Sequence, residues 1–242
     1  MLTRRQGDWG TRRRREGETE QQRDGKRVVG ARSRWSLASV FGAVESYSTV
    51  LEDRVAIVEG PGGMLLVLAD GAGGTGHGRS AADEVVAYAE RTLGKMRDPA
   101  DPKLWARYLK PVDESILQGG SGGETTAVLL WLTSHCIAGA SVGDSVAWLI
   151  TQSGHVDMTQ HQRRKPLVGS GEALPVPFAF GSPQGRLLMA SDGLIKYAPA
   201  DDIRRVVLTS TPDRAPRCLI DLVRLRSGKL QDDVGVIFCW AV

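Results

Sequence analysis

Residues 65–74 read Leu-Leu-Val-Leu-Ala-Asp-Gly-Ala-Gly-Gly, an apolar run that leads directly into an acidic residue and a glycine-rich turn. A short apolar run bounded by turn residues is typical of a buried β-strand. The glycines would let the backbone approach a cation closely, so that the Asp70 carboxylate and a peptide carbonyl could both ligate it. By itself, however, an Asp-Gly pair after a strand is more commonly a simple turn.

The same arrangement, an aspartate at the end or start of an apolar strand, occurs three more times along the chain. The aspartates concerned are Asp192 after the run 187–190, Asp232 and Asp233 before the run 234–238, and Asp144 after Gly143. Each has an ordinary explanation as a solvated acid at a strand end, or, for the Gly-Asp pair, as a two-residue hairpin turn. The motifs become informative only when they are considered together.

The hydrophobic pattern between these motifs predicts a mixture of strands and helices. Strands are expected over residues 35–44, 54–59, 64–69, 125–132, 135–142, 145–150, 186–190 and 234–240. Helical spacing of apolar residues predicts helices over 80–96, with Ser80 as the N-cap, over 101–117, and within 199–207 and 213–226. We expect the three runs between 125 and 150 to form an antiparallel meander. Residues 151–185 contain four prolines and predict an irregular excursion with short elements at most.

The composition predicts one cytoplasmic globular domain. The chain has 242 residues, 41% of them hydrophobic and 24% charged, which suits a single well-buried core. No apolar run approaches the roughly 18 residues that span a bilayer, and the N-terminus lacks the apolar stretch of a secretory signal. The three cysteines are odd in number and widely spaced among apolar neighbours, which favours reduced thiols over disulfides or a zinc site.

The positive net charge of the chain resides in its first 34 residues. Residues 1–34 carry a net charge of +6, whereas residues 35–242 carry a net charge of −3. We expect 1–34 to be a basic, disordered N-terminal tail and 35–242 to be the folded domain. Such a tail can be a solvated extension without a ligand, or it can contact nucleic acid, anionic lipid or an acidic partner. Nucleic-acid binding is not expected elsewhere.

Taken in order, the four aspartate motifs, together with Glu52-Asp53 and the segment Gly123–Ala127, resemble the metal-dependent protein phosphatase family, protein phosphatase type 2C, over nearly all of residues 35–242. The resemblance implies an α/β (α+β) fold, a four-layer α-β-β-α sandwich in which two antiparallel sheets are flanked by helices. The metal cleft would lie at one edge between the sheets, and the excursion 151–185 would include the family's flap. The implied activity is hydrolysis of phosphoserine and phosphothreonine in proteins, opposite a serine/threonine kinase, by a monomer.

The resemblance also implies a set of metal ligands in which Asp70, Asp192 and Asp232 are the catalytic residues. Asp70 would bridge two Mg²⁺ or Mn²⁺ ions, with Asp192 and Asp232 completing one and Glu52 with the Gly71 carbonyl completing the other. A possible third ion would be held by Asp144 with Asp192, and Asp53 and Asp233 would orient ligands. All these ligands are oxygens, which suits hard cations. A water between two such ions would attack the phosphoester.

The chain departs from the family pattern at the phosphate-binding position. The family places an arginine four residues before the glutamate, where this chain has Ser48. A guanidinium grip on phosphate is hard to replace with a hydroxyl, and the candidate substitutes are Arg34, Arg54 and Arg79. Ala72 stands where some members have a histidine, so His77 is a candidate general acid, although a surface histidine is the commoner case. These departures leave open a pseudophosphatase that binds phosphoproteins without turnover.

Overall fold

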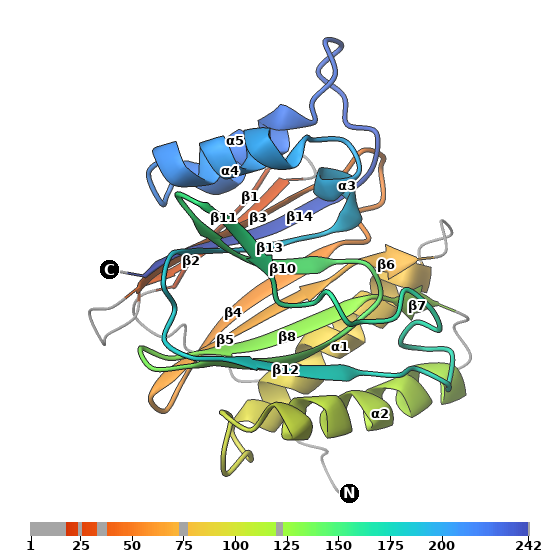
Figure 1. The fold of residues 1–242 in the computed structure, drawn as a ribbon. Helices are drawn as coiled ribbons and strands as arrows, with labels where there is room; N and C mark the ends of the chain where they lie inside the picture. Colours follow the sequence, from red (N-terminus) through yellow and green to blue (C-terminus); the bar gives the residue numbers. More distant parts are fainter. Residues whose placement is uncertain (1–17, 24–25, 33–37, 73–76, 120–122, 242) are drawn as a thin grey trace, which may run out of the picture.

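The computed structural model describes residues 18–23, 26–32, 38–72, 77–119 and 123–241. Two antiparallel sheets pack face to face, and helices cover both outer faces (Figure 1). This arrangement confirms the predicted α-β-β-α sandwich. Within the described residues, no helix is both long enough and apolar enough to cross a membrane.

The larger sheet has seven strands in the order β1-β2-β3-β14-β13-β10-β11. Their bounds are Glu18–Arg23 for β1, Lys26–Arg32 for β2, Ala38–Glu45 for β3, Val234–Ala241 for β14, Arg186–Ala190 for β13, Val146–Thr151 for β10 and Gly154–Asp157 for β11. Three helices lie on its outer face, namely α3 (Asp192–Ile195), α4 (Ala200–Thr209) and α5 (Ala215–Leu222) (Figure 1).

The smaller sheet has five strands in the order β12-β9-β8-β5-β4. Their bounds are Val176–Phe180 for β12, Ile137–Val142 for β9, Ala127–Leu132 for β8, Gly63–Ala69 for β5 and Arg54–Gly60 for β4. Helices α1 (His77–Leu93) and α2 (Pro102–Gln118) cover it, and the short strands β6 (Gly71–Ala72) and β7 (Glu124–Thr125) pair beside it.

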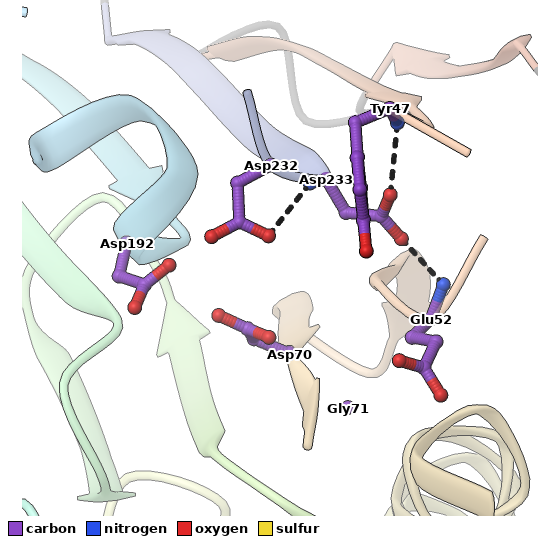
Figure 2. A pocket seen from close by; sticks show the side chains of 7 residues that line it. All are labelled: Tyr47, Glu52, Asp70, Gly71, Asp192, Asp232 and Asp233. Atoms are coloured by element: carbon purple, nitrogen blue, oxygen red, sulfur yellow. Dashed lines mark hydrogen bonds between the residues drawn. The ribbon is translucent and has the colours of Figure 1, made fainter. Parts of the chain in front are cut away.

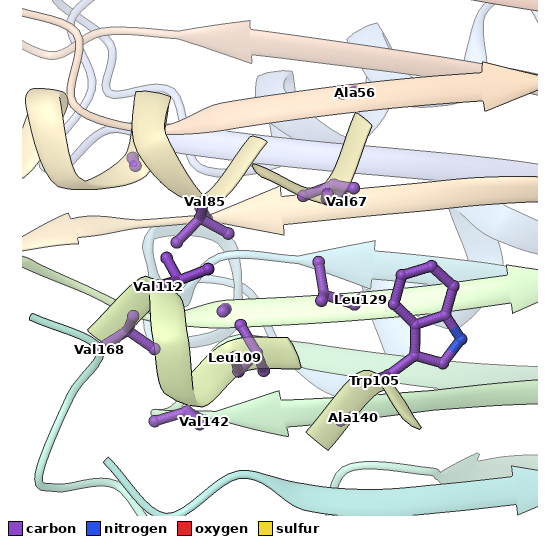
Figure 3. Packing of buried hydrophobic residues seen from close by; sticks show 14 of the residues in the cluster. Ala56, Val67, Val85, Trp105, Leu109, Val112, Leu129, Ala140, Val142 and Val168 are labelled. Atoms are coloured by element: carbon purple, nitrogen blue, oxygen red, sulfur yellow. The ribbon is translucent and has the colours of Figure 1, made fainter. Parts of the chain in front are cut away.

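Three hydrophobic cores separate the four layers, and strand β5 contributes to two of them. Leu65 and Val67 face the core under α1 and α2 (Figure 3), whereas Leu66 and Leu68 face the core between the sheets. Successive side chains of a strand point to opposite faces, so a strand buried on both faces reads as a continuous apolar run. Each such side chain contributes roughly 1.5–3 kcal/mol when it is fully buried.

Helix α2 begins and ends close to its predicted limits because local signals define it. The Asp101 carboxylate caps the helix by accepting the Lys103 backbone N–H at 2.9 Å, and a proline follows the cap. Trp105 and Leu109, four residues apart, are buried on one face. Helix α1 instead begins at His77, so the expected N-cap at Ser80 is wrong.

The predicted meander over residues 125–150 is also wrong. Strands β8 and β9 do pair as a hairpin, but β10 pairs with β13 and β11 in the other sheet. Gly143 and Asp144 therefore join the two sheets and do not form a hairpin turn. All three runs are apolar and β-branched, and that pattern does not specify which neighbour a strand will pair with.

The basic segment before residue 35 is partly ordered, which corrects the expected domain boundary. Strand β2 pairs with β3 over Lys26–Arg32, and β1 pairs with β2. Without them β3 would present a row of unpaired backbone N–H and C=O groups, and β2 satisfies these whatever the charge of its side chains. Residues 1–17, 24–25 and 33–34 of the expected tail lie outside the described residues.

The excursion 151–185 connects the two sheets and contains two short strands, in agreement with the expected short elements. It contributes β11 to the larger sheet and β12 to the smaller one. Its central part is fastened to α2 by Asp113, whose carboxylate accepts the backbone N–H groups of Gly169, Gly171 and Ala173 at 2.6–2.9 Å. All three cysteines are free thiols, as predicted.

Candidate metal centre

An acidic cavity of about 260 Å³ contains five of the predicted metal-ligand positions (Figure 2). Its lining residues are Tyr47, Glu52, Asp70, Gly71, Asp192, Asp232 and Asp233. The predicted bridging aspartate, its neighbouring glycine, the glutamate and the two aspartates from the C-terminal part of the chain thus share one space. They are brought together from the ends of four different strands.

The pairing of β13 with β14 brings Asp192 close to the two aspartates that precede β14. The Ser191 N–H donates to the Gly235 carbonyl at 2.9 Å, and the Gly235 N–H donates to Ser191 Oγ at the same distance. A Cβ atom on Gly193 would lie 1.9 Å from the Asp233 carbonyl oxygen. Only glycine permits this approach, which places the start of α3 directly against the segment before β14.

Asp70 is held on its backbone by two threonines of the segment that resembles the family. The Asp70 N–H donates to Thr126 Oγ1 at 3.0 Å, and Thr125 Oγ1 and the Thr126 N–H both donate to the Asp70 carbonyl at 2.9 Å. Next in the chain, Gly71 packs against Gly78 of α1, where a Cβ would lie 2.4 Å from the Gly78 carbonyl carbon. The backbone that delivers Asp70 is therefore fixed on both sides.

Asp233 anchors the loop that precedes β4. Its Oδ1 atom accepts the Ser46 hydroxyl and the Tyr47 backbone N–H, each at 3.0 Å, and its Oδ2 atom accepts the Glu52 backbone N–H at 2.6 Å. Hydrogen bonds to a carboxylate are about twice as strong as those between neutral groups. One side chain thus holds both ends of the loop 46–52 against the cavity.

Asp53 lies at 1% exposure next to the cavity, and neither of its carboxylate oxygens has a hydrogen-bond partner among the described residues. Burial, reinforced by the charges of Asp233 and Asp192, raises the pKa of Asp53 to about 7. Burial and the neighbouring Asp53 and Asp192 charges likewise raise the pKa of Asp70 well above its usual range. Clustered carboxylates of this kind are stabilised in their ionised form by bound cations.

The carboxylates do not form a finished cation site as they stand. Within the described part of the chain, no three or more His, Cys, Asp or Glu side chains are arranged to hold one metal ion. The ammonium of Lys196 is ion-paired with Asp192 and lies 3.9 Å from Asp232 Oδ2, so a positive charge already lies beside these two carboxylates. The donors are all oxygens and include an orphaned buried carboxylate nearby, so the residues fit Mg²⁺ or Mn²⁺.

The remaining predicted metal ligand, Asp144, does not line the cavity. Its Oδ2 atom is ion-paired with Arg164 Nε at 2.8 Å. Its charge nevertheless contributes to the raised pKa of Asp70. Asp144 is therefore close enough for its charge to act on Asp70, while its own carboxylate forms an ion pair with Arg164 of the excursion 151–185.

None of the predicted phosphate-binding arginines that the structure describes lines the cavity. Arg54 is buried and donates to Asp83 and to the carbonyls of Leu51 and Asp53, so its guanidinium is fully engaged. Arg79 is exposed and lies 3.9 Å from Asp83. Arg34 lies outside the described residues. The candidate acid His77 is exposed at the first residue of α1 and is not part of the cavity wall.

Sequence reasoning missed two residues at the site, Tyr47 and Lys196. Lys196 lies four residues after Asp192, a spacing that predicts an ion pair if the two residues lie on one helix. The sequence pattern did not predict the short helix α3 that begins at Asp192. Tyr47 has no comparable signal. It reaches the cavity only because Asp233 binds its backbone.

Comparisons with known proteins agree with this geometry. The family model described as Protein phosphatase 2C matches residues 45–170. A Streptococcus agalactiae serine/threonine phosphatase is similar, with 20% identity, a TM-score of 0.74, and coverage of 85% of this chain and 100% of that chain. The serine/threonine phosphatase Stp1 of Staphylococcus aureus has 21% identity, a TM-score of 0.70, and coverage of 85% and 94%. No curated protein matches this chain in sequence.

A third similar structure is the catalytic domain of the serine threonine protein phosphatase PstP, which was solved in complex with two manganese ions. It has 20% identity and a TM-score of 0.70, and the match covers 85% of this chain and 99% of that chain. At this identity, the likeness of all three structures establishes the shared fold.

Proposed function

The chain belongs to the protein phosphatase 2C family, a class of protein serine/threonine phosphatases, and we propose that it hydrolyses phosphoserine and phosphothreonine in proteins with the help of two divalent cations. One observation carries the proposal. Glu52, Asp70, Asp192 and Asp232, which are spread over the whole domain, line a single cavity. A soluble protein tolerates such a concentration of partly buried acids only when their charge is compensated.

In this proposal Asp70, Asp192, Asp232, Glu52 and the Gly71 carbonyl would hold two Mg²⁺ or Mn²⁺ ions, with Asp70 shared between them. When bound, the ions supply the Lewis acidity that activates water and stabilises charge on the phosphoryl oxygens. The similar PstP structure with two manganese ions supports this number. A third ion at Asp144 and Asp192 would have to bind beside the ion pair between Asp144 Oδ2 and Arg164.

The chain's other residues orient these ligands. Asp233 fixes the backbone of Glu52, and the threonines at 125 and 126 fix the backbone of Asp70. Asp53 lies beside Asp70 and is available to accept a hydrogen bond from a coordinated water. In this proposal the excursion 151–185 is the flap; the contacts that support it are the hydrogen bonds from its backbone to Asp113 of α2 and the ion pair of Arg164 with Asp144.

The test is Mn²⁺-dependent hydrolysis of a phosphothreonine peptide, with wild type compared with Asp70→Asn and Asp192→Ala. Each variant should lower kcat by more than about 100-fold, because a first ligand to the cations is lost. Asp201→Asn is the matched control, since its side chain is 94% exposed on α4. Millimolar Mn²⁺ should also raise the melting temperature of the wild type. No turnover and no thermal shift would overturn the proposal.

A phosphoprotein-binding pseudophosphatase is the second candidate. It stays open because no arginine or lysine is among the described residues that line the cavity, so the guanidinium grip on phosphate that the family resemblance implies is missing there. A pure binder would retain a phosphothreonine peptide in a pull-down or by calorimetry while releasing no phosphate, and Asp192→Ala would not change its turnover.

The proposal includes the setting in which the enzyme acts. Its substrates are phosphoproteins made by a serine/threonine kinase, and we expect it to act on them as a monomer in the cytoplasm. Any binding of nucleic acid would come from residues 1–34 and would weaken steeply with salt. Light scattering of the purified chain tests the monomer, and deletion of residues 1–17 tests the tail.

A further inference from the structure

We propose that the phenol hydroxyl of Tyr47 donates a hydrogen bond to the substrate phosphoryl group and so takes over the phosphate-binding position that an arginine would otherwise fill. The inference rests on the proposed phosphatase function and names a residue of the same site. Its starting point is the chemistry of the cavity wall. The other described lining residues are five acidic residues and one glycine, so Tyr47 is the only one of them with a neutral side chain that can donate a hydrogen bond.

The serine at the expected arginine position cannot take this role. Ser48 Oγ donates to the Val50 carbonyl and accepts the Val50 N–H, both at 3.2 Å, so its hydroxyl folds back onto its own loop. Ser48 also does not line the cavity. A phosphoryl group that enters the cavity therefore meets carboxylates, any bound cations and the Tyr47 ring.

Tyr47 is held in place by its backbone although its side chain is 54% exposed. Its N–H donates to Asp233 Oδ1 at 3.0 Å, and the adjacent Ser46 hydroxyl is also within 3.0 Å of that atom. Figure 2 shows the ring extending from this anchor toward the space bounded by Asp70 and Glu52. A fixed backbone with a reachable hydroxyl preorganises a donor at modest entropic cost.

The alternative donors are engaged elsewhere. Arg54 is buried against Asp83, and Arg79 lies 3.9 Å from the same carboxylate. Lys196, which is ion-paired with Asp192 in the absence of cations, does not line the cavity. A phenol donates one hydrogen bond to an anionic oxygen without adding a positive charge that would repel the cations. Tyr47 thus suits a phosphoryl group that is already neutralised by metal.

The experiment compares wild type, Tyr47→Phe and the control Tyr197→Phe, which alters a similarly exposed tyrosine (40%) outside the cavity wall. Three quantities are measured for each: kcat/KM on a phosphothreonine peptide, the Kd of inorganic phosphate for the Mn²⁺-loaded protein by calorimetry, and the Kd of Mn²⁺ alone. We expect Tyr47→Phe to weaken phosphate binding and kcat/KM by roughly 10-fold or more, the worth of one hydrogen bond to a charged group. Tyr197→Phe should match the wild type.

The affinity for Mn²⁺ should be the same in all three proteins. Equal phosphate Kd values for Tyr47→Phe and Tyr197→Phe would overturn the inference, and so would a parallel loss of Mn²⁺ affinity, which would assign Tyr47 to the metal site. If the wild type has no turnover, the proposed function fails, but phosphate binding still decides the role of Tyr47. If the wild type neither turns over nor binds phosphate, both are overturned.

Discussion

The backbone N–H of Glu52 donates to Asp233 Oδ2 at 2.6 Å across a separation of 181 residues in the chain. This hydrogen bond joins the loop before β4 to the segment before β14, and so connects two walls of the cavity. The position of Glu52, and with it any cation that Glu52 holds, therefore depends on the Asp233 carboxylate.

Asp233→Ala should loosen this joint. The change removes three hydrogen bonds to one carboxylate, and we expect the free energy of unfolding to fall by about 2–3 kcal/mol and the affinity for Mn²⁺ to fall by roughly 10- to 100-fold. Denaturant unfolding and calorimetry measure the two effects. A variant that keeps wild-type Mn²⁺ affinity would show that the loop positions itself without Asp233.

Lys196→Met should strengthen cation binding. The Lys196 ammonium occupies the space between Asp192 and Asp232, so a cation must displace it before it can use both carboxylates. Without the lysine, we expect a lower melting temperature in EDTA and a severalfold lower Kd for Mn²⁺, because an opposing ion pair no longer competes. Lys229→Met, at an exposed loop position, is the control. Weaker Mn²⁺ binding in Lys196→Met would contradict this competition.

The metal-free protein should become less stable between about pH 4 and pH 7. The pKa of Asp53 rises from 3.8 to about 7 on folding, so the native state binds more protons than the unfolded state over that range. Its contribution to stability is complete below the unfolded pKa and is lost as the pH rises through the folded one. Asp53→Asn should flatten this part of the pH profile measured in EDTA. An unchanged slope in the variant would rule out Asp53 as its source.

Glu45→Gln should destabilise the whole sandwich without acting on the cavity directly. The nearly buried Glu45 carboxylate, at the end of β3, is ion-paired with Arg217 and Arg224 of the α5 region at 2.7–2.8 Å. The Arg217 and Arg224 side chains are 48% and 18% exposed, so solvent screens the charges that remain, and we expect the free energy of unfolding to fall by about 1–3 kcal/mol. Glu90→Gln, on the exposed face of α1, is the control. A loss of less than about 1 kcal/mol in urea unfolding would argue against a structural role for this network.

Asp113→Asn should free the central part of the excursion 151–185. The variant loses charge from an acceptor of three backbone N–H groups, so hydrogen exchange at Gly169, Gly171 and Ala173 should accelerate by roughly 10-fold or more. Glu114→Gln, the exposed neighbour on α2, should leave these amides unchanged. Equal exchange in both variants would mean that other contacts hold the excursion.

Much of the fold could be predicted because its signals are local. Strand β5 reads as an apolar run since both of its faces are buried, and α2 carries its cap, its proline and its apolar spacing within 17 residues. Helix α1 begins three residues before the predicted Ser80, and its Gly78 packs against Gly71, a tertiary contact that the helical spacing of apolar residues does not reveal. Pairing partners were harder still, as β10 shows, since every apolar strand can pair with every other.

The sequence by itself identified the candidate metal ligands, because an aspartate at a strand end with a glycine beside it is a recognisable sequence motif. The four-layer fold followed from the resemblance of the ordered motifs to the protein phosphatase 2C family, whereas hydrophobic periodicity predicted only the individual strands and helices. Only the tertiary structure decided which side chains pair with one another: Arg54 forms an ion pair with Asp83, and Asp144 forms one with Arg164. It also decided that Tyr47 lines the cavity. These outcomes depend on the orientation of each side chain after distant segments have packed together, and neither the spacing of residues nor the composition specifies that orientation.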